Sequence, residues 1–255
     1  MTTAVHHVAD GPADAPVLLL SGSLGSSVDM WEPQVAPLSR RFRVVRLDHR
    51  GHGRSPVPPG PYDLPDLAGD VLALLDRLGV RRAHMAGLSL GGAVAMWLAA
   101  HAPDRIDRLA LLGTSADFGD PAPWAERAAT VRAHGTVAIA DTVVGRWFTP
   151  GYAAANPDTV RRMRDMVAAT PDEGYAACCG AIQRTDLHAD LPAITAPTLV
   201  LVGADDPATP PEHAERIAAA IPGAKLTVLP DAAHLASVQQ AEHVTTALLT
   251  HLDPP

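Results

Sequence analysis

Cysteine is scarce in this 255-residue chain, and the shortage excludes a scaffold held together by disulfides. Cys178 and Cys179 are the two cysteines, and neighbouring cysteines rarely pair with each other. The amino-terminal stretch also lacks a basic segment followed by an apolar run, which is the pattern of a secretory signal peptide. We therefore expect a reduced protein that works in the cytoplasm.

Runs of positive charge and long apolar runs are missing as well. The net charge is −8, and the sequence contains no run of five or more lysines and arginines. An acidic protein repels phosphate backbones, so we expect no nucleic-acid partner. The longest apolar runs have the length of strands, whereas a membrane span needs about 20 apolar residues. We expect no membrane partner, and we leave open a possible homo-oligomer.

What the sequence does contain is an alternation of short apolar runs with helical patterns. The helical patterns cover residues 67–78, 91–101 and 241–252, and Gly79 has the position of a C-terminal cap. Several strand-like runs are almost continuously apolar, as parallel strands covered on both faces are. This order predicts an α/β fold with a mostly parallel, doubly wound sheet. The predicted strands are residues 17–20, 44–47, 83–88, 109–112, 199–202 and 226–229.

The alternation stops between residues 116 and 191, where no run is typical of a strand. Proline-punctuated helical patterns take its place, so we expect a helical lid inserted between the two halves of the sheet. The predicted core comprises residues 1–116 and 191–255, and the predicted lid comprises 117–190. Within the lid the expected helices are residues 124–134, 137–147, 159–169 and 175–182.

The strand at 83–88 leads through Gly87-Leu88-Ser89-Leu90-Gly91 directly into a helix. A sharp strand-to-helix turn needs residues without side chains on both sides of the serine, because the backbone there is crowded. Such a turn exposes the hydroxyl at the carboxyl edge of the sheet, where open α/β folds bind ligands. We predict that Ser89 is a nucleophile; the alternative is a serine that merely caps the helix.

A serine hydroxyl needs a base, and the base needs an acid that orients it. In this type of fold the chain order is serine, acid, histidine. Asp206 follows the strand at 199–202, and His234 follows the strand at 226–229, so both fall at the same edge as Ser89. We favour Asp206 over its neighbour Asp205 because Pro207 fixes the turn after it.

Two histidines that are close in the sequence, His49 and His52, are the pattern from which a metal site could be inferred. No further cluster of ligands joins them, so we expect no metal.

The first predicted strand ends in a loop of glycines and serines, residues 21–27. Small residues allow backbone N–H groups to point at a bound oxygen, so this loop is a candidate for half of an oxyanion hole.

Several blocks of the chain resemble a known family, the α/β-hydrolases, over nearly the full length. The shared blocks are DHRGHGRS, GLSLGG, GADDPATPP and DAAHL. A narrower similarity to bacterial 3-oxoadipate enol-lactonases is carried by SGSLGSSVDMW, GRWFTP and EGYAACCGAIQRTDL. The resemblance implies Ser89 as nucleophile, His234 as base and Asp206 as acid. It also implies that the N–H groups of Leu90 and Leu24 hold the oxyanion, with Ser23 as the alternative to Leu24.

The resemblance further implies hydrolysis of 3-oxoadipate enol-lactone to 3-oxoadipate in aromatic catabolism, without a metal or organic cofactor. Because this substrate carries a free carboxylate, the lid should present a cation, and Trp147 is a candidate to line the pocket. A broad-specificity carboxylesterase shares every core block, and a non-catalytic receptor for a small ligand is the third possibility. The candidate lid cations are Arg127, Arg132, Arg146, Arg161 and Arg184.

Overall fold

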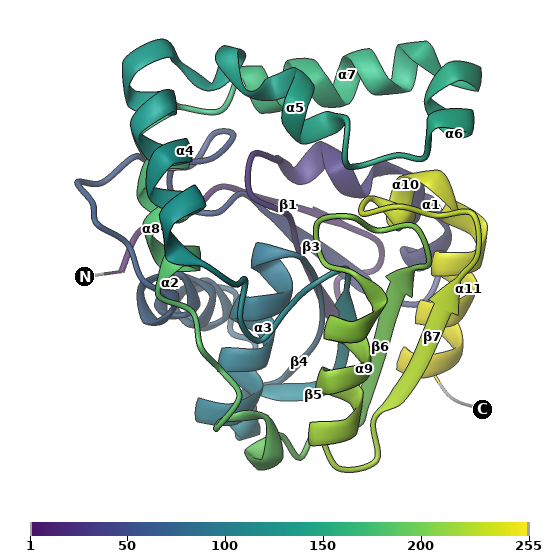
Figure 1. Ribbon diagram of the computed structural model, residues 1–255. Helices are drawn as coiled ribbons and strands as arrows, with labels where there is room; N and C mark the ends of the chain where they lie inside the picture. Colours follow the sequence, from purple (N-terminus) through teal and green to yellow (C-terminus); the bar gives the residue numbers. More distant parts are fainter. Residues whose placement is uncertain (1, 254–255) are drawn as a thin grey trace.

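A twisted sheet forms the centre of the computed structural model, which describes residues 2–253. The sheet has the strand order β1-β3-β2-β4-β5-β6-β7. β1 pairs antiparallel with β3, and every other neighbouring pair is parallel (Figure 1). The strands are β1 (His7–Asp10), β2 (Val17–Ser21), β3 (Arg43–Leu47), β4 (Ala83–Leu88), β5 (Ile106–Leu112), β6 (Thr198–Gly203) and β7 (Lys225–Leu229).

Each face of the sheet carries its own layer of helices. Side chains alternate across β2, so Leu19 packs in the cluster on one face while Leu18 and Leu20 pack in the cluster on the other. The first cluster holds α2 (Leu64–Arg77), α3 (Leu90–His101) and α9 (Pro211–Ala220). The second holds α1 (Glu32–Leu38) and α11 (Ala241–Leu252), with the short α10 (Ala236–Gln239) next to them. The doubly wound arrangement predicted from the sequence is confirmed.

The six predicted strands and the three predicted core helices are present. Residues of β4 and β6 are buried along their whole length, as continuous apolar runs between two helical layers require. Gly79 has a φ of +67° just after α2, which explains why that helix ends there. No helix within residues 2–253 is both long and apolar enough to span a bilayer.

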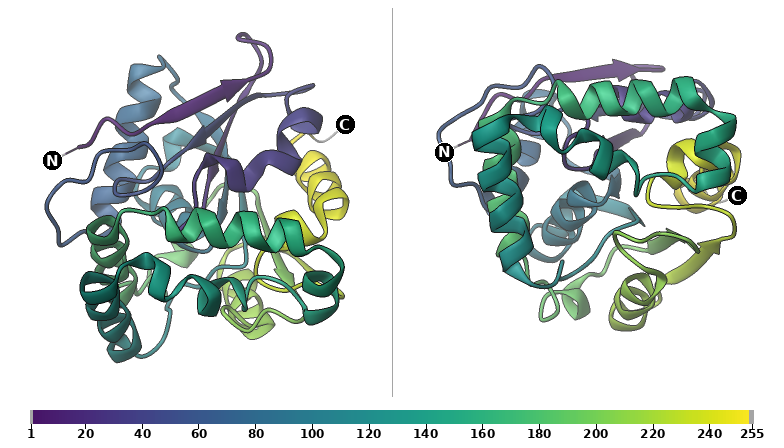
Figure 2. Two further views of the ribbon diagram at one scale, coloured as in Figure 1. Left: turned by 90° about the horizontal axis from the view of Figure 1, so that it is seen from above. Right: turned by 45° about the horizontal axis from the view of Figure 1, so that its top comes forward.

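A purely helical segment connects β5 to β6. Its helices are α4 (Pro121–His134), α5 (Ala140–Val144), α6 (Pro150–Ala155), α7 (Pro157–Ala168) and α8 (Asp172–Gln183). α4 and α8 run side by side, and α5, α6 and α7 lie across the end of the sheet (Figures 1 and 2). The two connections to the sheet also meet, because Asp117 and Asp186 form a β-bridge and Leu187 N donates to Ala116 O. We call residues 117–190 the inserted segment.

The interior of the inserted segment differs from the sequence prediction in two places. The helix expected at residues 137–147 is shorter and interrupted, since the chain there forms a 3-10 turn at Thr136–Ala138 and the short α5. Gly135, with a φ of +76°, and Gly145 bound this stretch and shorten it. A further short helix, α6, follows with Thr149 as its N-cap and Pro150 in its first turn.

Candidate active site

Ser89 occupies the turn between β4 and α3, where the backbone is strained. Its φ of +57° is one of two positive values among the described non-glycine residues, and such a conformation persists only where surrounding contacts enforce it. Ser89 N donates to Leu112 O at 3.0 Å, and the Thr114 hydroxyl donates to Ser89 O at 2.7 Å. The turn is therefore fixed from the neighbouring strand β5, and it holds the serine at the carboxyl edge of the sheet.

The glycines on either side of Ser89 are required by crowding. A Cβ on Gly87 would overlap the backbone of Gly91, and a Cβ on Gly91 would overlap the carbonyl group of Ser21. Gly91 N also donates to Gly22 O at 3.0 Å, so the start of α3 lies directly against the loop after β2. The spacing of glycines around the serine thus reflects the close approach of three backbone segments.

His234 and Asp206 form a buried pair on the loops after β7 and β6. The distance between His234 Nδ1 and Asp206 Oδ2 is 2.9 Å. Burial alone would raise the pKa of Asp206, but the interactions with His234 and Thr209 outweigh it and lower the pKa below its usual value. Asp205 is exposed and Asp206 is buried, so Asp206 is the aspartate that contacts the histidine.

Thr209 completes this arrangement, and the sequence reasoning did not single it out. Its hydroxyl donates to Asp206 Oδ2 at 2.8 Å and lies 3.3 Å from His234 Nδ1. The backbone N–H groups of Ala208 and Thr209 donate to Asp206 Oδ1 at 2.8 and 3.0 Å. The spacing of Thr209, three residues after the aspartate, is the available sequence signal, since aspartates commonly accept from N–H groups two and three residues on.

The loop after β2 contributes the candidate oxyanion donors. Ser23 and Leu24 both line the cavity that contains Ser89, and Leu90 is the first residue of α3. Gly25 N donates to His52 Nε2 at 2.9 Å, which fixes the loop directly after Leu24. The structure brings the predicted segment to the serine, while the choice between Leu24 and Ser23 as donor stays a prediction.

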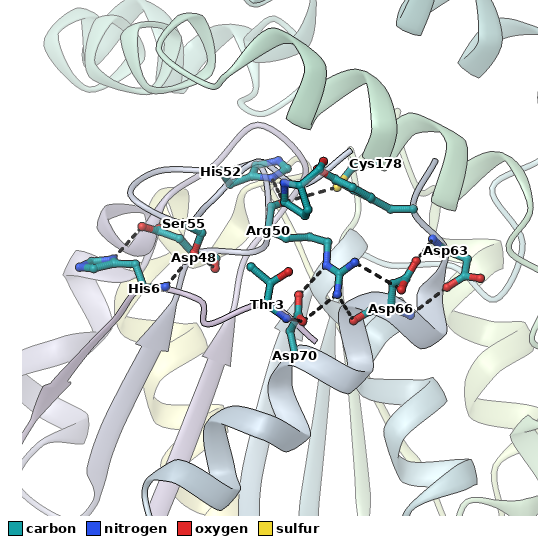
Figure 3. Close-up of polar contacts among 12 residues, drawn as sticks. Thr3, His6, Asp48, Arg50, His52, Ser55, Asp63, Asp66, Asp70 and Cys178 are labelled. Atoms are coloured by element: carbon teal, nitrogen blue, oxygen red, sulfur yellow. Dashed lines mark hydrogen bonds and ion pairs between the residues drawn. The ribbon is translucent and has the colours of Figure 1, made fainter. Parts of the chain in front are cut away.

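His52 is held by a buried polar network. Its Nδ1 lies 3.2 Å from Arg50 O, and the Arg50 guanidinium forms two hydrogen bonds with Asp70, at 2.6 and 2.7 Å (Figure 3). His49 Nε2 lies 3.0 Å from the Ser21 hydroxyl. Burial lowers the pKa of His49 to about 3 and that of His52 to about 4, so both rings are neutral at pH 7. Residues 2–253 contain no cluster of three or more potential metal ligands.

Ser89 and His234 line one small cavity of about 70 Å³ beneath the inserted segment. Among the described residues, no direct hydrogen bond joins the Ser89 hydroxyl to the imidazole of His234. Trp147 lines the same cavity, as do two of the five candidate arginines, Arg127 and Arg146. The other lining residues are Ser23, Leu24, Phe118, Trp124, Val143, Tyr175, Ile182, Ala208 and Thr209.

The remaining three candidate arginines have other partners. Arg132 pairs with Glu173 at 2.8 Å, and Arg161 pairs with Asp158 at 2.8 Å, both with exposed side chains. Arg184 donates to the carbonyl oxygen of Tyr62. The structure therefore reduces the candidate cations for an anionic ligand to Arg127 and Arg146.

Residues 15–241 match the sequence pattern of the alpha/beta hydrolase fold. The chain belongs to the α/β-hydrolase fold family. A relative from Acinetobacter baylyi, 3-oxoadipate enol-lactonase 2, is 38% identical over 94% of this chain and 89% of its own length. The crystal structure of the enol-lactonase from Burkholderia xenovorans LB400 has a TM-score of 0.95 and 43% identity, covering 97% of this chain and 96% of that one. The predicted fold and the resemblance to enol-lactonases are confirmed.

Other relatives of this hydrolase have a different named activity. A protein from Stutzerimonas stutzeri is 31% identical over 94% of this chain and 92% of its own length, and its name assigns carbamate hydrolysis only provisionally. Lactones, esters and carbamates all contain an acyl carbon that a serine can attack. The family membership and these relatives support a hydrolase, and the choice of substrate depends on the cavity.

A buried tyrosine lines the cavity of the hydrolase. Tyr175 is fully buried, and its hydroxyl interacts with Arg127, another lining residue of the same cavity. Burial raises the pKa of this hydroxyl, so it stays protonated and can donate. The Arg127 guanidinium lies 4.5 Å from the centre of the Trp124 ring. This wall of the cavity thus combines aromatic surface, a cation and a tyrosine hydroxyl.

A larger hollow of 740 Å³ lies between α7 and residues 26–33. Neither Ser89 nor His234 lines it. Size alone does not make it the reaction site, because catalysis requires the nucleophile and the base to reach one substrate atom.

Proposed function

We propose that this hydrolase opens 3-oxoadipate enol-lactone to 3-oxoadipate, a step of aromatic catabolism. The observation that carries the proposal is a single cavity lined by Ser89, His234 and two arginines of the inserted segment. A serine and a histidine supply acyl-transfer chemistry, and the arginines suit the carboxylate of the substrate. The high identity to enol-lactonases supports the same substrate.

The first half of the reaction is acylation of Ser89. His234 Nε2 accepts the hydroxyl proton as Ser89 Oγ attacks the lactone carbonyl, and Asp206 stabilises the imidazolium through Nδ1. Such serine–base contacts are often long without ligand and tighten when substrate binds. The N–H groups of Leu90 and Leu24 stabilise the oxyanion, a contribution of about 3–4 kcal/mol per donor in related sites. The ring C–O bond then breaks, and the enol oxygen leaves with the proton from His234 or as an enolate.

The second half is hydrolysis of the acyl-enzyme. The released enol remains attached through the carbon skeleton and tautomerises to the ketone. A water molecule loses a proton to His234 and attacks the ester carbonyl, after which the Ser89 oxygen leaves and takes the proton back. The product of ring opening and hydrolysis is the 3-oxo dicarboxylate.

We propose that the inserted segment acts as a lid over the cavity. Side chains of this lid bind the carboxylate of the substrate. Arg127 and Arg146 line the cavity, and the Tyr175 hydroxyl adds a donor. The protein has a net charge of −8, so attraction for an anion must come from cations close to it. The aromatic rings of Trp124 and Trp147 provide the apolar surface for the unsaturated ring.

We expect Ser89→Ala to lower kcat for the enol-lactone by about 10⁴-fold or more, because the acyl-enzyme cannot form. Steady-state hydrolysis of the lactone measures this effect, and circular dichroism checks that the variant folds. A folded Ser89→Ala protein with wild-type turnover would contradict the assignment of the nucleophile.

The Arg127→Met substitution tests carboxylate recognition, with Arg161→Met as the matched control on the exposed face. Methionine keeps apolar contact with Trp124 but removes the charge. We expect kcat/KM for the anionic lactone to fall about 10- to 100-fold, while kcat/KM for neutral p-nitrophenyl acetate stays within about twofold. The control should change neither value, and an equal loss for both substrates would exclude a specific role in binding the carboxylate.

A broad-specificity carboxylesterase is the alternative that shares the same core residues. It differs from the lactonase in substrate preference, so the two are separated by comparing kcat/KM for the enol-lactone, p-nitrophenyl acetate and a small aryl carbamate. A lactone value well above the other two supports our proposal. An ester value that equals or exceeds the lactone value identifies an esterase, and no turnover of any substrate identifies a non-catalytic receptor.

A further inference from the structure

The side chain of Gln239, the last residue of α10, bridges two segments that are far apart in the sequence. Gln239 Oε1 accepts from the N–H groups of Thr149 and Ala233, both at 3.2 Å. Gln239 Nε2 donates to the Thr149 hydroxyl at 2.7 Å and to Asp231 O at 2.8 Å. Both acceptor positions and both donor positions of the amide are thus satisfied. One end of the bridge is the inserted segment, and the other is the loop that carries His234.

The residues on both sides of His234 are held through their backbone. Ala233 N donates to Gln239, and Leu235 N donates to Trp147 O at 2.9 Å. Trp147 belongs to the inserted segment and its side chain lines the cavity. The position of the histidine is therefore determined together with the position of residues 147–149, of which Trp147 lines the cavity.

The loop also contains a strained residue that Gln239 stabilises. Asp231 has a φ of +52°, the second positive value among the described non-glycine residues. Residues other than glycine adopt this conformation rarely, and aspartate is one of those that do so as single residues in turns. The hydrogen bond from Gln239 Nε2 to Asp231 O holds the turn in this conformation, two residues before Ala233.

We propose that Gln239 is a positioning residue that couples the inserted segment to the loop of His234, so that the base is aligned with Ser89 only while residues 147–149 are docked. The inference rests on the proposed serine mechanism. It assigns to Gln239 no contact with substrate. Its contribution is to the fraction of time in which His234 has the productive orientation, and loss of that orientation lowers the rate of acylation.

Gln240 provides a matched control in the neighbouring position. Its Nε2 lies 3.3 Å from Pro230 O and 3.4 Å from Asp231 O, and its Oε1 lies 3.0 Å from His243 Nδ1. Pro230 and Asp231 belong to the loop of His234 and His243 belongs to α11, so within the described residues the side-chain hydrogen bonds of Gln240 do not reach the inserted segment. A substitution at Gln240 therefore perturbs the same region without breaking the bridge to Thr149.

The test compares Gln239→Leu, Gln239→Glu and Gln240→Leu in the full chain. Leucine removes every hydrogen bond of the amide, whereas glutamate retains an acceptor for the N–H groups of Thr149 and Ala233. The readout is the rate at which a fluorophosphonate probe labels Ser89, since this reaction requires the nucleophile and its base but no particular substrate. We expect labelling to be about 10-fold slower in Gln239→Leu, intermediate in Gln239→Glu and unchanged in Gln240→Leu.

Thermal unfolding and near-ultraviolet circular dichroism establish that each variant is folded before the rates are compared. Equal labelling rates for folded Gln239→Leu and Gln240→Leu would overturn the inference. If Gln239→Leu does not fold, a wild-type rate in Gln239→Glu together with an equal rate in Gln240→Leu would overturn it as well. Failure of the wild-type protein to be labelled at Ser89 is a different result, which contradicts the proposed function itself.

Discussion

Both oxygens of the Asp206 carboxylate have polar partners, which come from its own loop and from His234. Oδ1 accepts two backbone N–H groups, and Oδ2 accepts the Thr209 hydroxyl and faces His234 Nδ1 at 2.9 Å. A buried carboxylate with such donors stays ionised. In the proposed mechanism its negative charge stabilises the imidazolium that forms when His234 accepts a proton. At the scale of single residues, Thr209 holds the carboxylate that, in the proposed mechanism, orients His234 as the base.

Replacing Thr209 by valine tests this dependence, because valine has nearly the same shape but lacks the hydroxyl. The lost hydrogen bond to a carboxylate is worth about 1.5 kcal/mol or more, so we expect kcat/KM for the lactone to fall about 10-fold. The pKa of Asp206 should rise at the same time, which nuclear magnetic resonance titration of a ¹³C-labelled carboxylate measures. Thr209→Ser retains the hydroxyl and should keep most of the activity; equal losses in both variants would contradict the role of the hydrogen bond.

At the scale of elements, the sequence was sufficient to predict those strands and turns whose residue pattern follows directly from burial or crowding. Buried parallel strands such as β4 and β6 require continuous apolar runs, and the turn at Ser89 requires small neighbours, so both could be predicted. The antiparallel edge strand β1 was missed because it is only partly buried and carries little apolar periodicity. Gln239 was missed because its partner in the inserted segment, Thr149, lies 90 residues away in the sequence, and no local pattern marks that contact.

The crowding between β2 and α3 leads to a prediction at this scale. By helix propensity alone, Gly91→Ala should stabilise α3 by up to about 1 kcal/mol. Because the new Cβ would overlap the carbonyl group of Ser21, we expect instead a loss of about 2–3 kcal/mol in the free energy of unfolding. Gly151→Ala in α6 is the control, since nothing lies within 4 Å of its added Cβ and a gain of about 0.5–1 kcal/mol is expected. Urea unfolding measures both, and a stabilised Gly91→Ala variant would refute the close approach.

At the scale of the whole molecule, buried polar groups connect parts of the chain that the core alone would not join. Arg50 binds Asp70 on α2, and Asp70 also accepts from the N–H group of Thr3 near the amino terminus (Figure 3). The carbonyl group of Arg50 lies beside His52 and 3.9 Å from the Cys178 sulfur of α8. His52 accepts from Gly25 N, so this network is connected to the loop after β2 that lines the candidate site.

Acid should therefore destabilise the molecule through His49 and His52. In the folded protein their pKa values are about 3 and about 4, against 6.5 for an ordinary histidine, because burial disfavours the charged rings. Below pH 6.5 the unfolded chain binds protons that the folded chain does not bind, so stability is full above pH 6.5 and is lost as the pH falls towards 4. From these pKa values each histidine should cost about 2 kcal/mol of unfolding free energy between pH 7.5 and pH 5.

Urea unfolding at a series of pH values measures this slope, and His52→Gln separates the contributions. Glutamine cannot titrate in this range, yet its Oε1 can still accept from Gly25 N, so the variant should fold and lose about half of the pH dependence. If His52→Gln has the same slope as the wild-type protein, His52 does not titrate with unfolding, and the acid sensitivity must come from other groups. If the slope falls while activity at pH 7 is retained, the ring of His52 acts as a neutral acceptor that supports the loop next to Leu24.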